Sequence, residues 1–299
     1  MRKILPLINY SLFWLVVCGW IHSTLFAGVG TLVKEGPVST RFVVEKNVHP
    51  KTKTIEIGWW MKREPGWHTY WSSPGDVGVP PNLEWTLPEG IIFRNLDYAP
   101  PQLVKMFKVF AHGHRGESLF ICTFDVKREL AEGEVLTFKA KSSWLACYNT
   151  CLPTFADLEI KVPVNYEVEI DLRWNSLFNE FRKSKPVEPP AEWIAKCDSK
   201  LSTSGNLDKE FVTLRFPIEG SGKNSSFRFF AHGRFVRSNI FQIPKKLKNN
   251  KGENLMEISM ELSYWRDPAQ KNLTGLLFSS NGWDNATSKF YKVKLPLGK

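Results

Sequence analysis

The sequence predicts an all-β protein in which a β-sandwich is followed by a second, smaller β domain, with a short helix and a linker between them. Three observations support this prediction. Apolar and polar residues alternate through most of the 299-residue chain, and this period is typical of half-buried antiparallel strands. Proline and glycine clusters such as 79–81 and 88–90 separate these segments, as expected of turns between short strands. Near residue 170 the period changes to that of a helix.

The composition excludes several protein classes. With 42% hydrophobic and 23% charged residues, the chain is neither globally disordered nor a collagen or a coiled coil. Lysine and arginine number 40 against 30 acidic residues, a formal charge of +10, which favours attraction to anionic surfaces. The basic residues are scattered rather than clustered, so we expect no nucleic-acid partner.

Residues 1–27 have the features of a secretory signal peptide. A positively charged start precedes an apolar stretch over 12–20, and small residues lead to a cleavage site after Ala27. Cys18 leaves a lipoprotein signal as an alternative. No later segment reaches the roughly 18–20 apolar residues of a membrane span. We therefore expect a periplasmic protein that is soluble after cleavage and has no membrane span in the mature chain.

The β-sandwich is expected over residues 28–168. Its clearest alternating rows lie at 54–61, 120–126, 136–140 and 158–164. Rows of this length, bounded by turn residues, predict strands that bury one face each.

Residues 169–192 are expected to form the helix and the linker. The large apolar residues between Trp174 and Phe181 follow the i, i+3, i+4, i+7 spacing of an amphipathic helix. The proline-rich run 185–190 predicts a stiff, extended connection. Strand periodicity then returns over 193–299, which we assign to the second β domain. Its clearest rows lie at 212–218, 256–262 and 291–295.

Cys147 and Cys151 form the candidate functional motif. Along one extended strand, residues four apart lie about 13 Å from each other, beyond the reach of a disulfide. A bridge therefore requires the chain to reverse between them, and Asn149 tolerates the conformations of such a hairpin. Closing so short a loop stabilises the fold by only roughly 2 kcal/mol, so the bond could open without unfolding the domain. The spacing alone leaves a structural disulfide and a redox-active one equally open.

Five motifs follow one another along the first domain. They are Pro65–Trp71, Pro74–Pro81, Trp85–Gly90, His112–Gly116 and Trp144–Pro153. This ordered series, over about residues 35–165, resembles the N-terminal periplasmic domain of DsbD-type and ScsB-type thiol:disulfide interchange proteins. The second domain resembles the less distinctive β region that follows in ScsB-type members, through Leu273–Leu277.

The resemblance implies an immunoglobulin-like sandwich in which Cys147 and Cys151 are the redox pair. In that family a membrane-embedded thiol donor reduces the pair, which then reduces thioredoxin-like periplasmic proteins, usually through the second cysteine. Family members usually continue into membrane helices and a thioredoxin-like domain, whereas this sequence stops at Lys299, so we expect a separate donor protein. The alternative is a non-enzymatic partner-binding or copper-handling domain in which the pair is a structural disulfide.

The resemblance also implies a cap loop that shields the pair, at 105–110 in this sequence. We expect Phe107 or Phe110 to be its lid, with core packing as the alternative for both. Trp67 and Tyr70 match family aromatics near the pair, although a sandwich core would also use them.

The residues that flank the pair predict which sulfur is accessible. Trp144 opens an apolar run that ends at Cys147, so we expect that sulfur to be sheltered. Cys151 precedes Leu152 and Pro153, and we expect this rigid rim to expose its sulfur to a docking partner.

Three histidines are candidates for metal binding or for activating a thiol. His112 and His114 would share one face of a strand and, with a thiol nearby, could bind copper; no third ligand is evident, so we expect neither a metal nor a cofactor. His68 is a candidate for promoting thiolate formation, or it simply packs beside aromatic rings.

The remaining cysteines and tryptophans give weaker signals. Cys122 shares a face with apolar residues and is expected to be a buried, inert thiol, while Cys197 either stays free or pairs with Cys122. Twelve tryptophans suggest sugar binding as an alternative, but several lie within the signal peptide or the five motifs. No arrangement typical of a hydrolase or a phosphate-binding loop is evident.

Overall fold

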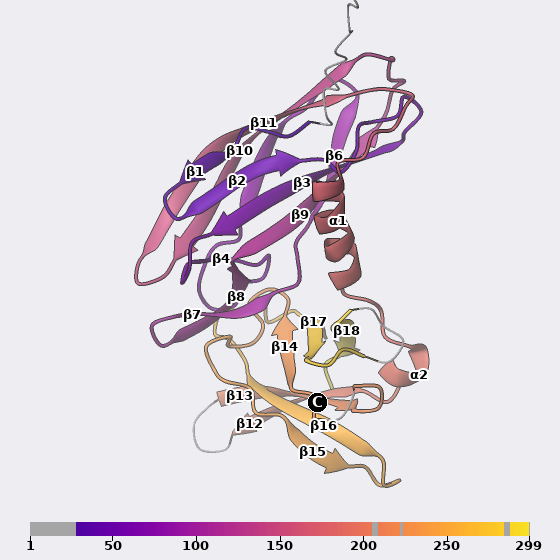
Figure 1. Cartoon of the computed structure of the whole chain (residues 1–299). Helices are drawn as coiled ribbons and strands as arrows, with labels where there is room; N and C mark the ends of the chain where they lie inside the picture. The colour runs from indigo at the N-terminus through magenta and orange to yellow at the C-terminus, as the bar shows by residue number, and fades with distance from the viewer. Residues whose placement is uncertain (1–27, 205–208, 222–223, 284–287, 299) are drawn as a thin grey trace, which may run out of the picture.

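The computed structural model describes residues 28–204, 209–221, 224–283 and 288–298. The predicted signal peptide and Cys18 lie outside the described residues. The described chain forms two β-rich parts, one above the other in Figure 1, with one longer helix beside their junction. The predicted all-β fold is thereby confirmed. In the described ranges no helix is long and apolar enough to cross a membrane.

The first part is a sandwich of two antiparallel sheets. One sheet runs, from edge to edge, through β1 (Val33–Glu35), β2 (Val38–Val43), β3 (Thr54–Arg63), β9 (Glu117–Val126) and β6 (Ile91–Asp97). The other runs through β11 (Cys151–Pro163), β10 (Val135–Cys147), β4 (His68–Tyr70), β8 (Val109–Arg115) and β7 (Gln102–Met106), while β5 (Asn82–Thr86) also pairs with β10.

The core of the sandwich follows from the alternation seen in the sequence. Every second residue of β10, from Leu136 to Ala146, is buried, and the buried face of β3 and β9 meets it with Trp59, Phe120 and Phe124. Trp59 and Phe120 meet edge to face, with ring centroids 5.8 Å apart, and Phe124 packs against Phe138 of β10 with centroids 5.0 Å apart. The aromatic core fixes the spacing of the two sheets.

Helix α1 (Leu172–Ser184) lies against the outer face of β9. Asp171 caps its N-terminus by accepting hydrogen bonds from the backbone N–H of the second and third residues that follow. The apolar stripe predicted from the sequence buries Trp174, Phe178 and Phe181 against a cluster that includes Leu119. The helix is therefore held by both a cap and an apolar face.

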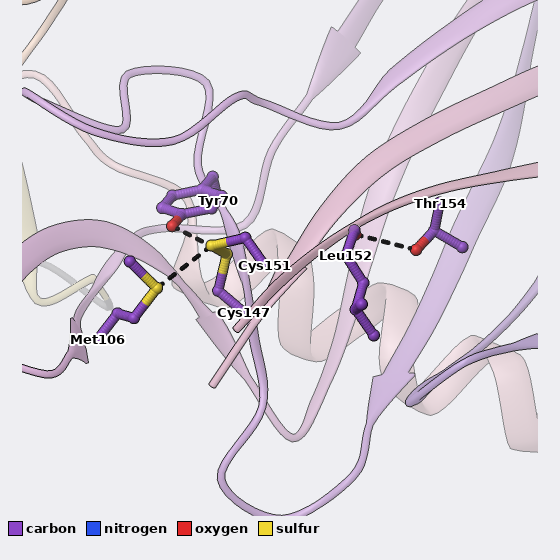
Figure 2. Close-up of a disulfide and its surroundings, with 6 residues drawn as sticks. All are labelled: Tyr70, Met106, Cys147, Cys151, Leu152 and Thr154. Carbon is purple, nitrogen blue, oxygen red and sulfur yellow. Dashed lines mark hydrogen bonds between the residues drawn. A yellow bond between two sulfur atoms is a disulfide. The ribbon is translucent and has the colours of Figure 1, made fainter. Parts of the chain in front are cut away.

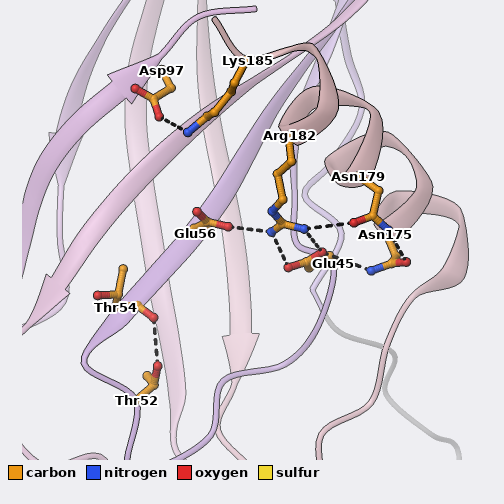
Figure 3. Close-up of polar contacts among 9 residues, drawn as sticks. All are labelled: Glu45, Thr52, Thr54, Glu56, Asp97, Asn175, Asn179, Arg182 and Lys185. Atoms are coloured by element: carbon orange, nitrogen blue, oxygen red, sulfur yellow. Dashed lines mark hydrogen bonds and ion pairs between the residues drawn. The ribbon is translucent and has the colours of Figure 1, made fainter. Parts of the chain in front are cut away.

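Ion pairs fasten the end of α1 to the sandwich (Figure 3). Nη2 of Arg182 lies 2.6 Å from Oε1 of Glu45 and 2.8 Å from Oε2 of Glu56. Just beyond the helix, Nζ of Lys185 lies 2.6 Å from Oδ2 of Asp97. The hydrogen bond from Arg182 holds the pKa of Glu45 below its usual value.

The second part contains two smaller antiparallel sheets. One runs through β12 (Asp198–Ser204), β13 (Lys209–Pro217), β16 (Asn254–Glu261) and β15 (Lys245–Lys248), and the other through β14 (Phe227–Ala231), β17 (Asn272–Ser279) and β18 (Phe290–Pro296). The short helix α2 (Ala191–Ile194) covers their shared core with Trp193. The linker is extended, and Val187 pairs with β18 by exchanging backbone hydrogen bonds with Phe290 and Lys292.

An apolar cluster joins the two parts. Trp71 of the first part packs with Phe230, Leu276 and Phe290 of the second. The ring of His232 also contacts Trp71, with centroids 5.6 Å apart. His112 of β8 also contacts Phe230, with ring centroids 4.9 Å apart, so the cluster borders the β7–β8 hairpin.

Hydrogen bonds complete this seam. Oγ of Ser238 accepts from the backbone N–H of Asp76 at 3.0 Å and donates to the carbonyl oxygen of Phe110 at 3.1 Å. Ser263 donates to Oδ1 of Asp76 at 2.9 Å, and Ser73 accepts from the backbone N–H of Gly233 at 3.1 Å. The second part therefore holds the β7–β8 hairpin at Phe110, next to its tip, and holds the loop after β4 at Ser73 and Asp76.

Candidate redox site

The two cysteines of the motif face each other at the end of a long hairpin (Figure 2). Strands β10 and β11 pair without a break from Val135 opposite Pro163 to Cys147 opposite Cys151. A three-residue turn joins the two strands. The Cα atoms of Cys147 and Cys151 lie 4.3 Å apart, and a disulfide links the two side chains. The reversal that the spacing required is therefore present, and it places the bond at the tip of the hairpin.

The two sulfur atoms have different surroundings. Cys147 is on the inner strand β10, and its side chain is 0% exposed. Cys151 is on β11, the edge strand of the sheet, and is only partly buried. An incoming thiolate therefore reaches the sulfur of Cys151 more readily than that of Cys147.

Cys147 is buried on the outer face of its sheet rather than in the sandwich core. Its neighbour Ala146 points into the core, whereas Cys147 packs with Tyr70, Val104 and Ala111. The cover over this face consists of the β7–β8 hairpin and the loop after β4. The disulfide thus has a small apolar chamber of its own, separate from the main core.

Tyr70 is the polar neighbour of Cys147. Its hydroxyl donates a hydrogen bond to Sγ of Cys147 at 3.3 Å (Figure 2), and burial raises the pKa of Tyr70, so the hydroxyl keeps its proton. The loop at Gly78 closes over this ring: a Cβ there would lie 2.2 Å from the ring, and the backbone φ is +100°. Both facts require glycine at this position.

His68 on β4 is the cross-strand partner of Cys147 on β10. The ring of His68 packs edge to face against Tyr70. Burial, followed by the positive charges of Arg115 and Arg63, lowers the pKa of His68 to about 4. The ring is therefore neutral at pH 7, and its buried Nδ1 has no hydrogen-bond partner among the described residues. A neutral imidazole in this place can accept a proton but does not attract a thiolate by charge.

The cap over the pair is the tip of the β7–β8 hairpin. The Sδ atom of Met106 lies 3.2 Å from Sγ of Cys151 (Figure 2). Of the two phenylalanines proposed as a lid, Phe107 occupies the turn with a φ of +51° and is 66% exposed, and Phe110 lies under the ammonium of Lys105. The cap contacts the disulfide through Met106, a residue that the sequence analysis did not single out.

The other flanking residues occupy separate environments. Trp67 packs on Tyr148 of the hairpin turn, with ring centroids 6.1 Å apart. Trp144 is buried in the sandwich core, whereas Pro153 is exposed beside Leu152 on the edge strand. Trp144 and Ala146 thus face away from Cys147 and do not provide the predicted shelter, whereas Leu145 of the same run packs in the cluster around Cys147.

His112 and His114 point away from the disulfide. Nδ1 of His112 lies 3.1 Å from the carbonyl oxygen of Ser73, and Nε2 of His114 lies 2.9 Å from that of Ala99. Burial lowers the pKa of His112 to about 4 and that of His114 to about 3. In the described part of the chain, no three His, Cys, Asp or Glu side chains come together as metal ligands.

The two remaining described cysteines are unpaired. Cys122 is fully buried in the sandwich core, as the alternation predicted, and burial raises the pKa of its thiol. Cys197 belongs to the core of the second part, where burial raises its pKa to about 12. Because they occupy different cores, they do not form the second disulfide considered from the sequence.

Comparison with known proteins agrees with this site. Residues 37–163 match the family described as "Thiol:disulfide interchange protein DsbD, N-terminal", a range that contains both cysteines. The crystal structure of the N-terminal periplasmic domain of ScsB from Proteus mirabilis matches with a TM-score of 0.63 and 16% identity, over 92% of this chain and 99% of that chain. No curated protein sequence matches significantly. The structural likeness concerns the fold, and it extends over both β-rich parts.

Proposed function

Because residues 37–163 match the family of DsbD N-terminal domains, we propose that the protein is a periplasmic module that relays electrons through Cys147 and Cys151. The observation that carries this proposal is the asymmetry of the pair: one sulfur is enclosed beside a hydroxyl donor and the other lies on an edge strand under a single methionine. A purely structural bridge has no need of this arrangement.

The proposed exchange takes place in two steps. A thiolate of the electron donor attacks Sγ of Cys151, the bond between the two cysteines breaks, and Cys147 leaves as a thiolate that Tyr70 stabilises by hydrogen bonding. A second donor thiol then resolves the mixed disulfide, so the donor becomes oxidised and both cysteines become reduced. In the second half of the cycle, the Cys151 thiolate attacks an oxidised partner and Cys147 resolves that intermediate.

The surface beside Cys151 supports protein partners rather than a small thiol. Exposed apolar side chains gather around the hairpin tip and the cap: Phe107, Tyr148, Leu152 and Phe155. Exposed apolar patches on soluble proteins commonly mark interaction sites. We propose a membrane-embedded protein as donor and thioredoxin-like periplasmic proteins as acceptors, both docking on this surface.

Two measurements test the proposal. Against a glutathione buffer, an exchange pair should titrate well above the roughly −300 mV below which structural disulfides lie. In the periplasm, Cys147→Ala should accumulate mixed disulfides through Cys151, whereas Cys151→Ala should accumulate few, as seen on non-reducing gels after acid quenching. Cys122→Ala serves as the control, because its thiol is buried in the core.

The outcomes separate the alternatives. Equal trapping by both single variants would contradict the assigned order of attack while leaving exchange itself intact. A potential below the structural limit, together with no trapping by either variant, would favour a structural disulfide in a non-enzymatic binding domain.

A further inference from the structure

A large groove separates the two β-rich parts on the side of α1. Its volume is about 1240 Å³. One wall contains Leu177 and Phe181 of α1 and Leu103 of β7, and the opposite wall contains Phe227 of β14 and the segment that follows Phe241. Figure 1 shows these elements around the junction of the two parts. None of the residues that pack around the disulfide lines the groove, so the groove is distinct from the redox site.

The charges along the groove are strongly unbalanced. Two glutamates, Glu117 and Glu180, line it. The cations that line it are Arg115, Lys183, Arg228, Lys246 and Lys289. None of these five cations forms an ion pair with a carboxylate among the described residues, although most other arginines there do. Unpaired positive charge concentrated in one groove is complementary to an anionic ligand.

Arg228 is the most constrained of these cations. It lies on β14, is partly buried, and stacks its guanidinium 5.0 Å from the ring centroid of Phe241. Burial lowers the pKa of Arg228, which means that the folded protein holds a partly desolvated cation without a carboxylate. Such a group is costly unless a counter-charge is supplied.

The size and the edges of the groove favour a peptide over a small molecule. Pockets for small ligands usually measure about 300–1,000 Å³, and this groove is larger. Strand β7 is an edge of its sheet, and its first residues, Gln102 and Leu103, line the groove. The facing edge of β14 is already occupied, because the side-chain amide of Gln242 bonds both the N–H and the carbonyl of Phe229 at 2.8 Å. An extended peptide can add to an open strand edge of this kind.

We propose that this groove binds an extended segment of a protein partner in which acidic residues alternate with apolar ones. In an extended chain such residues point to opposite sides, so the acids meet the five cations while the apolar side chains pack against the phenylalanines. The backbone of the segment adds to the open edge of β7. This proposal does not depend on the chemistry of the cysteines and is tested without it.

The probe is a synthetic ten-residue peptide that alternates glutamate and leucine and carries a neutral fluorophore. Its binding to the mature protein is followed by fluorescence anisotropy at low and at physiological salt. A lysine–leucine peptide of the same pattern controls for apolar association, and a version with N-methyl groups on alternate backbone nitrogens tests addition to β7. Laurate, added as a competitor, tests whether the groove instead prefers an anionic lipid.

Variants of the protein locate the binding. Arg228→Met keeps an apolar stem over Phe241 and removes the charge, and the double variant Lys246→Glu with Lys289→Glu reverses two exposed charges at the rim. Lys294→Glu is the matched control, since this lysine is also exposed and unpaired in the second part but lies outside the groove. We expect the double variant to raise the Kd about tenfold, Arg228→Met to weaken binding as well, and the control to leave it unchanged.

The outcomes decide the proposal. The proposal is supported if the glutamate peptide binds and if its binding is weakened by salt, by the groove variants and by N-methylation. Equal binding of the lysine peptide, equal binding of the N-methylated peptide, or equal weakening by Lys294→Glu overturns it. Absence of peptide binding together with laurate binding also overturns it, in favour of a lipid site. Circular dichroism and the Tm of each variant verify that the fold is retained.

Discussion

Replacing Tyr70 by phenylalanine removes a single oxygen atom from the surroundings of the disulfide. The ring of Tyr70 is buried beneath the loop at Gly78 and packs against His68, so its packing remains. The lost interaction is the 3.3 Å hydrogen bond from the hydroxyl to Sγ of Cys147. The substitution therefore tests one polar contact and nothing else in the chamber.

The expected magnitude follows from what the hydroxyl donates to. A hydrogen bond to a charged acceptor is worth about 1.5–3 kcal/mol, against about 1 kcal/mol or less for a weak neutral acceptor such as disulfide sulfur. The Cys147 thiolate thus gains about 1–2 kcal/mol over the oxidised form. Since 30 mV corresponds to about 1.4 kcal/mol for a two-electron couple, Tyr70→Phe should lower the reduction potential by about 20–40 mV. The pKa of the Cys147 thiol should rise by roughly one unit.

The assay is a redox titration of wild type and Tyr70→Phe against glutathione at pH 6, 7 and 8. The gap between them should widen as pH rises, because only the thiolate gains the full hydrogen bond. Tyr148→Phe is the control, since it removes the same oxygen from an exposed tyrosine at the turn of the same hairpin. Equal potentials for wild type and Tyr70→Phe, or a higher potential in the variant, would refute the reasoning.

Three further predictions concern the cap, the helix and acid stability. Met106→Ala should let glutathione reduce the disulfide several-fold faster in stopped-flow measurements, whereas Phe107→Ala should not, because Met106 contacts Cys151 and the side chain of Phe107 is largely exposed. Arg182→Ala should lower the free energy of unfolding in urea by about 1–2 kcal/mol at pH 7; the loss should shrink as the pH falls through the lowered pKa of Glu45, because protonation removes the charge that pairs with Arg182. The neutral, buried His112 and His114 have pKa values of about 4 and 3, below the value near 6.5 of a histidine in the unfolded chain. The contribution of these neutral histidines to stability should therefore be complete above pH 6.5. The free energy of unfolding should fall by about 2 kcal/mol per histidine between pH 7 and pH 5. Replacing either one by phenylalanine should reduce that fall in urea titrations at the two pH values, and an unchanged fall would contradict the assignment.

Much of the fold could be predicted from the sequence, because the period of burial is local information. The row expected at 136–140 is part of β10, and the stripe expected at 174–181 is part of α1. The chain reversal between Cys147 and Cys151 followed from their spacing on the condition that the two residues form a disulfide. Each of these predictions needed only residues close to one another in the chain.

The cover of the site could not be predicted in the same way. Alternation places Cys147 on the outer face of its sheet, where a strand residue is ordinarily exposed, and the burial comes from segments about 40 and 75 residues earlier in the chain. The contact between Met106 and Cys151 depends on how the β7–β8 hairpin bends over the sheet, which no local pattern encodes. The hydrogen bonds of Ser238 to Asp76 and Phe110 cross between the two parts and have no signature in the sequence.

The attachment of the cap at Phe110 limits how it can move. Because Ser238 holds the carbonyl of Phe110, uncovering Cys151 requires displacement of only the few residues from Met106 to Val109. Motions of such short segments take about nanoseconds to microseconds, whereas domain rearrangements take microseconds to milliseconds. We therefore expect the cap to open and close many times between the arrivals of partner proteins, so that the fraction of time for which it is open, and not the speed of opening, scales the rate of exchange. The cap also selects by shape: a bulky partner that displaces the methionine on docking reaches the sulfur, and a freely diffusing oxidant meets a closed surface for most of the time.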